Sequence, residues 1–255
     1  MNQHTLDQLT ELKLKGFKEA FILQSQNPDY LHMPFEERLA HLIESEVLAR
    51  KNDRTKRYLR ASKLKYRNAF LTDIEYIGSR NLQREVISSL MKNQWIEQAH
   101  NIIITGATGT GKTFIACALA HNAIASGYNA YYVRISKLLS EIKLARADGS
   151  YLFFLKKMTK MRVLILDDLG VSPMDARDAQ ELLEVIEERI GFGSIIVTSQ
   201  LPVDHWYDYF NNGTVADAVL DRLVHNSHRL GLEGDSMRKM TFKKKDENKQ
   251  NEASG

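Results

Sequence analysis

The stretch NIIITGATGTGKT, residues 101–113, joins a run of strand-forming residues to a glycine-spaced loop that ends in Lys112 and Thr113. The loop matches the pattern G-x-x-x-x-G-K-[ST], in which glycine residues let backbone N–H groups converge on an anion. A helix that starts at Lys112 points its N-terminal dipole at the same place. The stretch therefore predicts a site for the phosphates of a nucleotide, with Mg²⁺ as its companion ion.

Each part of this loop has an expected role. Lys112 reaches the β- and γ-phosphates and serves catalysis as well as binding, while the Thr113 hydroxyl group ligates Mg²⁺. The alternative is a glycine-rich turn without a ligand, but the preceding strand and the following alanine-rich helix favour ATP. The residues expected to contact the nucleotide are Gly106, Ala107, Thr108, Gly109, Thr110, Gly111, Lys112, Thr113 and Phe114.

Two acids follow a second apolar run, VLILDD, residues 163–168. In a phosphate-loop fold the first acid, Asp167, holds the Mg²⁺ ion, and the second, Asp168, polarises the attacking water as a general base. Taken alone, the pair reads as two solvated carboxylates at a strand end. Combined with the loop, it predicts an ATPase, although such a base is more often glutamate and a module that only binds ATP stays open.

A third apolar run, IIVTSQLP, residues 195–202, ends in polar side chains. Thr198 or Ser199 is expected to lie between the two acids and sense the γ-phosphate. The alternative is ordinary turn chemistry ahead of Pro202.

Strand and helix patterns alternate between residues 101 and 232. Apolar strands that do not alternate with polar residues, separated by helices, are typical of an α/β fold with a parallel sheet and helices on both faces. We expect a small helical domain over residues 1–70, a connector with one helix over 71–100 and a polar tail over 241–255, with the ATPase domain spanning 71–240. The predicted strands are 101–105, 130–134, 162–168, 194–199 and 228–232, and the predicted helices are 5–25, 83–94, 112–125, 136–147, 175–190, 203–210 and 214–227.

Composition narrows the class of protein. No apolar run approaches the length of about 20 residues that a membrane helix needs, and Cys117 is the single cysteine. These features predict a reduced, cytoplasmic protein without a membrane partner.

Basic charge is concentrated after residue 49, where Asp53 is the only acid in a run of cations. A helix there aligns Arg50, Arg54 and Arg57 as a ridge that follows a phosphate backbone without reading bases. The alternative is a solvated helix or a subunit contact. The cations expected to bind double-stranded DNA, largely independently of its sequence, are Arg50, Lys51, Arg54, Lys56, Arg57, Arg60 and Lys63.

Four segments together resemble the IstB/DnaC-like ATPases of the AAA+ superfamily, with the insertion-sequence helpers of transposition, IstB, the closer match. The resemblance covers nearly the whole chain and implies the AAA+ P-loop NTPase fold without a separate lid domain. Its most discriminating parts are LDDLG and GDSMR. The segments are GATGTGKT (106–113), LILDDLG (164–170), VTSQLP (197–202) and ADAVLDRLVHNSHRLGLEGDSMR (216–238).

The resemblance also implies partners and further site residues. It implies homo-oligomers with ATP between neighbouring copies, in which Arg222 of one copy completes the site of the next. A helix-surface arginine paired with an acid is the alternative for Arg222. Arg238 resembles a position that contacts the nucleotide of its own chain, and Lys143 and Arg146 belong to a helical insertion, 135–160, that contacts DNA.

The function expected from the resemblance is an ATP-dependent, DNA-binding helper that assembles on target DNA and recruits or regulates a cognate transposase. ATP hydrolysis then switches between assembly and disassembly. The close alternative is a replicative helicase loader of the DnaC type. A small-molecule kinase is a third reading, and the basic N-terminal domain and the short C-terminus disfavour it.

Overall fold

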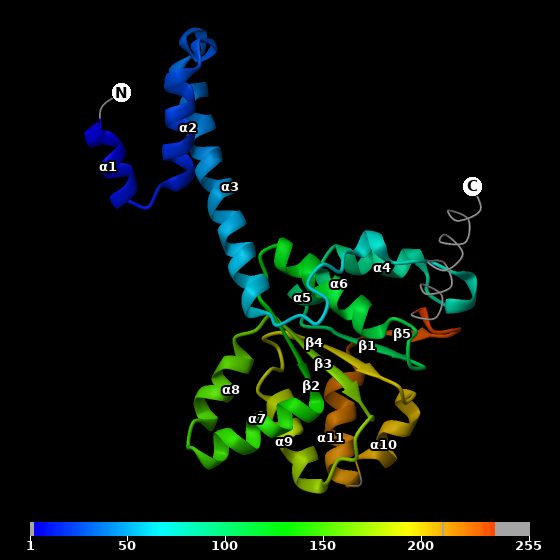
Figure 1. Ribbon diagram of the computed structural model, residues 1–255. Helices are drawn as coiled ribbons and strands as arrows, with labels where there is room; N and C mark the ends of the chain where they lie inside the picture. Colours follow the sequence, from blue (N-terminus) through cyan, green and yellow to red (C-terminus); the bar gives the residue numbers. More distant parts are fainter. Residues whose placement is uncertain (1–2, 211, 238–255) are drawn as a thin grey trace, which may run out of the picture. The chain divides into compact units, whose positions relative to one another are not determined.

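The computed structural model describes residues 3–210 and 212–237 (Figure 1). The chain forms two compact units, Met1–Tyr58 and Leu59–Gly255. This division falls inside a long helix, whereas the sequence places a boundary near residue 70. The extent of an independent N-terminal domain therefore stays a prediction.

The N-terminal unit is helical, as expected. It contains α1 (Gln3–Glu11), α2 (Lys15–Gln26), the short 3₁₀ helix η1 (Pro28–His32) and most of α3 (Phe35–Ala61). The expected single helix over 5–25 is two helices, because Lys13 adopts a left-handed conformation with φ 56° between them. At Gly16 an added Cβ atom would lie 2.4 Å from the Ser45 carbonyl oxygen, so glycine lets α2 approach α3 closely.

The second unit is built on five parallel strands in the order β2-β3-β4-β1-β5. This confirms the predicted α/β class. The strands are β1 (Asn101–Gly106), β2 (Ala130–Arg134), β3 (Val163–Leu169), β4 (Ser194–Ser199) and β5 (Ser227–Leu232).

Helices cover both faces of this sheet. Figure 1 shows α4 (Arg84–Met91), α5 (Gln94–Glu97) and α6 (Lys112–Ala125) on one side. The other side carries α7 (Ile135–Ala147), α9 (Ala176–Glu187) and α11 (Gly213–Val224), with α8 (Tyr151–Thr159) and α10 (Trp206–Tyr209) beside them. The predicted helix over 83–94 is α4 and α5, because Asn93 is left-handed with φ 61° between them. The remaining turns are the 3₁₀ helices η2 (Leu71–Asp73), η3 (Gly78–Arg80) and η4 (Val203–His205).

The core explains why the sequence predicts these elements well. Ile102, Ile103 and Ile104 of β1 are fully buried, as continuous apolar strands between two helical layers must be. In α6 the buried alanines, such as Ala116 and Ala120, let the helix lie close to the sheet directly after the loop. Because all strands are parallel, their carboxyl ends lie at one edge, where β1, β3 and β4 deliver their polar termini.

Within the described ranges 3–210 and 212–237, no helix has both the length and the apolar character that a membrane span requires.

Candidate functional site

The loop between β1 and α6 has the backbone geometry that its glycines predict. Gly106, Gly109 and Gly111 have φ values of 145°, 91° and 92°, a region that residues with a β-carbon rarely adopt. A Cβ atom on Gly109 would also lie 2.2 Å from Ser236 Oγ. The loop is therefore both conformationally and sterically restricted to glycine, as an anion cradle requires.

Lys112 lies at the start of α6 and bends back over the loop. Its Nζ atom donates to the carbonyl oxygens of Gly106 (2.7 Å) and Ala107 (2.8 Å). Burial lowers the pKa of Lys112, and the nearby charges of Asp168 and Asp167 oppose that shift. An ammonium group has three donors, so Lys112 can hold the loop and still donate to a phosphate oxygen.

Arg80 of η3 holds the phosphate loop by hydrogen bonds to its backbone, a role that the sequence analysis did not predict. Its Nε and Nη2 atoms both donate to the Thr110 carbonyl oxygen, at 3.0 and 2.7 Å, and Nη1 donates to that of Glu75 at 2.8 Å. Only 5% of Arg80 is exposed, and burial lowers its pKa. No sequence signal marks Arg80, because its partner lies 30 residues away in the chain.

Asp167 is the centre of a hydrogen-bond network at the end of β3. Thr113 Oγ1 donates to its Oδ1 atom at 2.8 Å, Thr198 Oγ1 donates to the same atom at 2.6 Å, and Tyr132 Oη donates to Oδ2 at 2.7 Å. Asp167 itself is fully buried. Three hydroxyl groups thus hold this carboxylate in one orientation next to Thr113, the other predicted metal ligand.

The Asp168 side chain points in a different direction from that of Asp167, because β3 is irregular at this position. The register between β3 and β4 shifts between Leu166 and Leu169, and Asp168 has a left-handed φ of 67°. Such a bulge redirects side chains. Asp167 points into the protein, while the Asp168 side chain is 35% exposed, lines the cavity above the loop and lies 3.6 Å from Arg134 Nε.

The three polar residues at the end of β4 and directly after it have different hydrogen-bond partners. Thr198 donates to Asp167 and accepts from the backbone N–H of Asp168 at 3.1 Å, so it does lie between the two acids. Ser199 instead donates to the Leu169 carbonyl oxygen (2.8 Å) and accepts from the Leu201 N–H (3.0 Å), which is turn chemistry. Gln200, which the sequence did not single out, accepts from Thr108 Oγ1 at 2.8 Å and lines the cavity.

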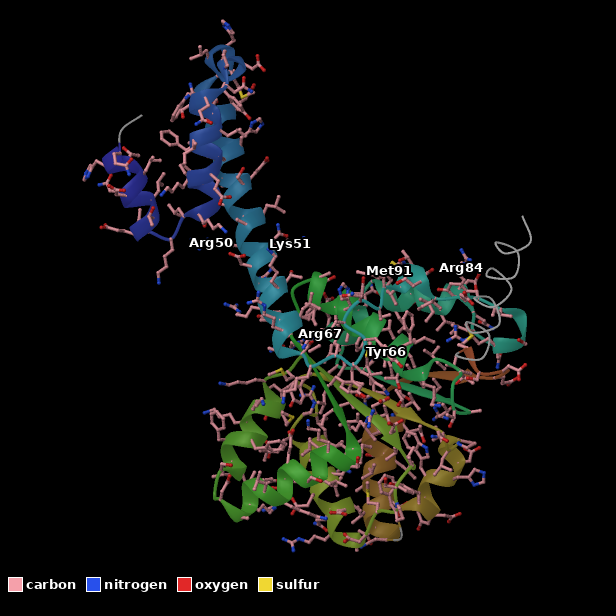
Figure 2. The ribbon with its side chains drawn as sticks, viewed as in Figure 1. Arg50, Lys51, Tyr66, Arg67, Arg84 and Met91 are labelled. Carbon is pink, nitrogen blue, oxygen red and sulfur yellow. The ribbon has the colours of Figure 1, made fainter. Side chains whose placement is uncertain are left out.

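A cavity of about 510 Å³ joins these parts. The loop and Asp168 form one wall, and residues of the segment between α3 and α4, including Tyr66 and Ile74, form another. The Tyr66 and Phe114 rings lie 6.0 Å apart at this wall. Figure 2 labels Tyr66 in the segment that follows α3. One end of the cavity is polar, with loop N–H groups, Lys112 and carboxylates, and the other end is aromatic and apolar. These two ends suit the charged phosphates and the aromatic base of a nucleotide.

Arg222 lies at the other end of the sheet. The Asn101 side chain, at the first residue of β1, donates to the Arg222 carbonyl oxygen at 2.9 Å, whereas the phosphate loop follows the last residue of β1. Six strand residues span about 20 Å. The Arg222 side chain pairs with Glu187 at 2.9 Å, so the predicted trans arginine is not part of its own chain's site.

The cations of α3 are helical, as the DNA prediction requires. Arg50 and Lys51 are labelled on α3 in Figure 2. Arg50 Nε pairs with Glu46 at 2.6 Å, and this contact is the first cause of a lowered pKa at Glu46. The Arg57 guanidinium lies 5.6 Å from the Tyr58 ring centroid. Among the cations predicted to bind DNA, the structure records no ion pair for the others on the described part of α3, which are Lys51, Arg54, Lys56, Arg57 and Arg60.

The two predicted DNA contacts on α7 have carboxylate partners on the acidic helix α9. Lys143 Nζ lies 2.7 Å from Asp178 Oδ1. Arg146 pairs with Glu181 at 2.6 Å and Glu184 at 2.7 Å, and its guanidinium stacks 3.8 Å from the Tyr151 ring centroid. The structure therefore gives both residues a packing partner that the sequence did not reveal.

Arg238 lies outside the described residues. The segment just before it does reach the loop, since the Met237 N–H donates to the Gly109 carbonyl oxygen at 2.9 Å.

The parallel sheet, the glycine loop, Lys112 and the acid pair define the class: this is a P-loop nucleotide-binding protein with the AAA+ fold. Solved structures agree on the fold. A DNA replication initiation factor superposes with a TM-score of 0.57 at 18% identity, over 72% of this chain and 55% of that one. A structure of the DnaC helicase loader gives 0.52 at 19% identity, over 70% and 99%.

The chain belongs to the IstB-like ATP binding protein family, whose model matches residues 7–245. An insertion sequence ATP-binding protein of Sinorhizobium fredii is 38% identical over 92% of this chain and 96% of its own length. The ATP-binding protein of insertion sequence IS1162 from Pseudomonas fluorescens is 42% identical over 79% and 87%. The resemblance found in the four sequence segments is thereby confirmed.

Proposed function

We propose that this protein is an ATP-dependent, DNA-binding ATPase that assembles on target DNA and recruits or regulates the transposase of its insertion sequence, with ATP hydrolysis as the switch between assembly and disassembly. The observation that carries the proposal is the meeting of the phosphate loop with Asp167, Asp168 and Thr198 at one edge of the sheet. The chain belongs to a family of ATP-binding proteins with relatives from insertion sequences. In such a protein this site would bind ATP and change state when the γ-phosphate is lost, which is how a nucleotide switch works.

The residues present fit Mg²⁺ and ATP. The loop glycines leave no room for a Cβ atom, and two oxygen donors of the kind that Mg²⁺ prefers, Thr113 Oγ1 and Asp167 Oδ1, are only 2.8 Å apart. The loop N–H groups and Lys112 would hold the phosphates, and Thr113 with Asp167 would hold the ion. Bound Mg²⁺·ATP would supply a γ-phosphoryl group whose transfer to water releases energy.

Asp168 is the proposed general base. It is the acid whose side chain faces the cavity, while Asp167 is buried and fully engaged. The Arg134 guanidinium lies 3.6 Å from the Asp168 carboxylate and orients it at the cavity wall. A partly exposed carboxylate at this position can accept the proton of the attacking water.

The position of Arg222 supports the proposal that ATP is bound between neighbouring copies of the chain. It lies at the amino end of β1, away from the loop of its own chain. A catalytic role for Arg222 therefore requires the site of another copy, where its positive charge would stabilise the transferring phosphoryl group. Its present partner, Glu187, is 45% exposed, so the pair can exchange for an intermolecular one.

The cations of α3 are a proposed DNA contact. They extend along one helix and bear little acidic compensation. Their charge predicts binding that depends strongly on salt and weakly on sequence.

The test combines assembly with nucleotide state. Mass photometry on a duplex should show oligomers with a non-hydrolysable ATP analogue and their loss with ADP. Lys112→Ala should abolish nucleotide binding and assembly together, whereas Lys92→Ala, an exposed lysine on the same unit, should match the wild type. Assembly by Lys112→Ala at the wild-type level would overturn the proposal.

A separate pulldown distinguishes the partner class. The proposal predicts that the ATP-bound protein captures the cognate transposase and not the host replicative helicase. Capture of the helicase alone would favour the loader reading.

A further inference from the structure

The turn between α9 and β4, residues 188–193, exposes two large apolar side chains. Ile190 is 54% exposed and Phe192 is 67% exposed. A single exposed apolar residue is common on protein surfaces and needs no explanation. Here two of them lie on one short turn at the amino end of the sheet, so the surroundings of the turn decide whether they form a contact surface.

The base of the 188–193 turn is held in place by Arg189, of which only 1% is exposed. Its Nη1 atom donates to the Met158 carbonyl oxygen, and its Nη2 atom donates to the Ser194 carbonyl oxygen at 3.1 Å. The backbone N–H groups of Phe192 and Gly193 both donate to the Arg189 carbonyl oxygen, at 3.1 and 3.3 Å. The turn therefore presents Phe192 on a preformed backbone, which lowers the entropic cost of a contact.

The 188–193 turn is continuous with Arg222. Ile190, Arg189 and Arg222 line one cavity of about 230 Å³. Among the residues that the structure describes, this lining includes two arginines and no carboxylate. Aromatic residues and arginine are enriched at the centres of protein interfaces. The surface that carries Arg222, which has no nucleotide to act on in its own chain, therefore also carries an apolar tip.

Val171 offers a matching apolar position at the opposite edge of the sheet. It is 51% exposed, and its N–H group donates to the Asp168 carbonyl oxygen at 3.4 Å, so it lies beside the proposed general base. Within the described ranges, Val171 is the only exposed large apolar residue on the loops that follow β1, β3 and β4. A second copy whose Arg222 reaches the phosphates must place its 188–193 turn near this same edge.

We propose that the 188–193 turn is the apolar anchor by which one copy of the chain docks on the nucleotide edge of the next, with Phe192 packed against the surface around Val171. The inference rests on the proposed assembly with ATP between copies and names the two surfaces that meet. The contact is head-to-tail, because Arg222 and the site that it completes lie at opposite ends of one sheet. The phosphates of bound ATP complement the cationic surface beside the anchor.

The experiment measures self-association of the full chain on a duplex, with a non-hydrolysable ATP analogue, by mass photometry. Phe192→Asp and Val171→Asp should each weaken assembly about tenfold or more, because each places a charge in an apolar contact. Phe192→Ser should give a smaller loss in the same direction. Leu31→Asp, which changes a 77% exposed residue of η1, should match the wild type. The ATP affinity of dilute Phe192→Asp should not change, because the turn lies away from its own chain's loop.

Mixing the two aspartate variants tests the pairing of the surfaces. Phe192→Asp keeps an intact Val171 surface, and Val171→Asp keeps an intact turn with Arg222 beside it. An equal mixture should therefore form pairs and recover part of the ATP hydrolysis that each variant lacks alone. Thermal unfolding of each variant checks that the fold is retained.

The outcomes separate the anchor from the proposed function. If the wild type assembles and either aspartate variant assembles equally well, the anchor is wrong while the proposed function stands. If both variants fail and their mixture recovers no hydrolysis, the head-to-tail contact between these two surfaces is overturned. Absence of nucleotide-dependent assembly by the wild type would instead defeat the proposed function.

Discussion

Tyr132 Oη donates a hydrogen bond of 2.7 Å to Oδ2 of Asp167, from the edge strand β2 to the buried acid at the end of β3. The two residues are 35 positions apart in the chain, and parallel pairing of the two strands brings them together. Burial raises the pKa of Tyr132, and its hydrogen bond to Asp167 raises it further. The hydroxyl group therefore keeps its proton and orients the proposed metal-binding carboxylate.

Removing that hydroxyl group should weaken the metal site. We expect Tyr132→Phe to raise the Mg²⁺ concentration that gives half-maximal ATP hydrolysis by about tenfold, the scale of lost outer-shell hydrogen bonds. Nucleotide binding measured without Mg²⁺ should not change. Tyr128→Phe is the control, since Tyr128 bonds to Glu97 at a distant surface. Equal Mg²⁺ dependence in both variants would contradict the role.

Arg80 should be necessary for the shape of the loop. Replacing it with methionine leaves the Thr110 carbonyl oxygen without both of its guanidinium donors. We expect a loss of about 1–3 kcal/mol in unfolding free energy and a loss of ATP affinity of about tenfold, measured by urea denaturation and calorimetry. Arg80→Lys should restore only part of each, because lysine lacks the planar fork. Full ATP affinity in Arg80→Met would show that the loop holds its shape without this residue.

Asp168 should affect hydrolysis and not binding. Asparagine tolerates the left-handed φ of 67°, so Asp168→Asn should fold normally and bind ATP. Phosphate release should fall by about 10² or more, the usual contribution of a general base. Asp168→Ala should show the same catalytic loss and an added cost of about 1 kcal/mol in stability, because alanine disfavours this conformation. Undiminished phosphate release by Asp168→Asn would exclude a general-base role.

Arg146 distinguishes a packing role from a DNA contact. Its contacts with Glu181, Glu184 and the Tyr151 ring predict that Arg146→Met lowers unfolding free energy by about 1–3 kcal/mol. If Arg146 also neutralises a DNA phosphate, the salt slope of binding should fall by about 0.9. Duplex titrations at several salt concentrations, beside urea unfolding of the same variant, separate the two effects. Unchanged stability would refute the packing role.

Cys117 should make stability depend on alkaline pH. The residue is fully buried, and burial raises the pKa of its thiol from 9.0 to about 11. Because the folded pKa is the higher one, the stabilisation is complete below about pH 9 and is lost as pH rises to about 11, by at most about 2–3 kcal/mol. Urea unfolding of the wild type should show this loss. In Cys117→Ala the unfolding free energy should decline less over the same pH range. An identical decline in both proteins would show that the Cys117 thiol is not the cause.

The parallel α/β fold and the location of the candidate site could be predicted from the sequence. Continuous apolar strands can be buried only between two layers, and the glycine spacing before Lys112 and Thr113 serves an anion wherever the loop lies. The acid pair was also predictable, because parallel strands bring their carboxyl ends to one edge.

The direction in which each of those side chains points depends on the folded arrangement of the strands. Whether Asp167 or Asp168 faces the cavity depends on a register shift between β3 and β4. The sequence of β3 alone does not reveal how it pairs with β4. The guanidinium of Arg80 and the hydroxyl group of Tyr132 find their hydrogen-bond partners far away in the chain. Hydrogen bonds and ion pairs act over a few ångströms in space, so the residues that orient a site are revealed only when the strands and the connector are folded together.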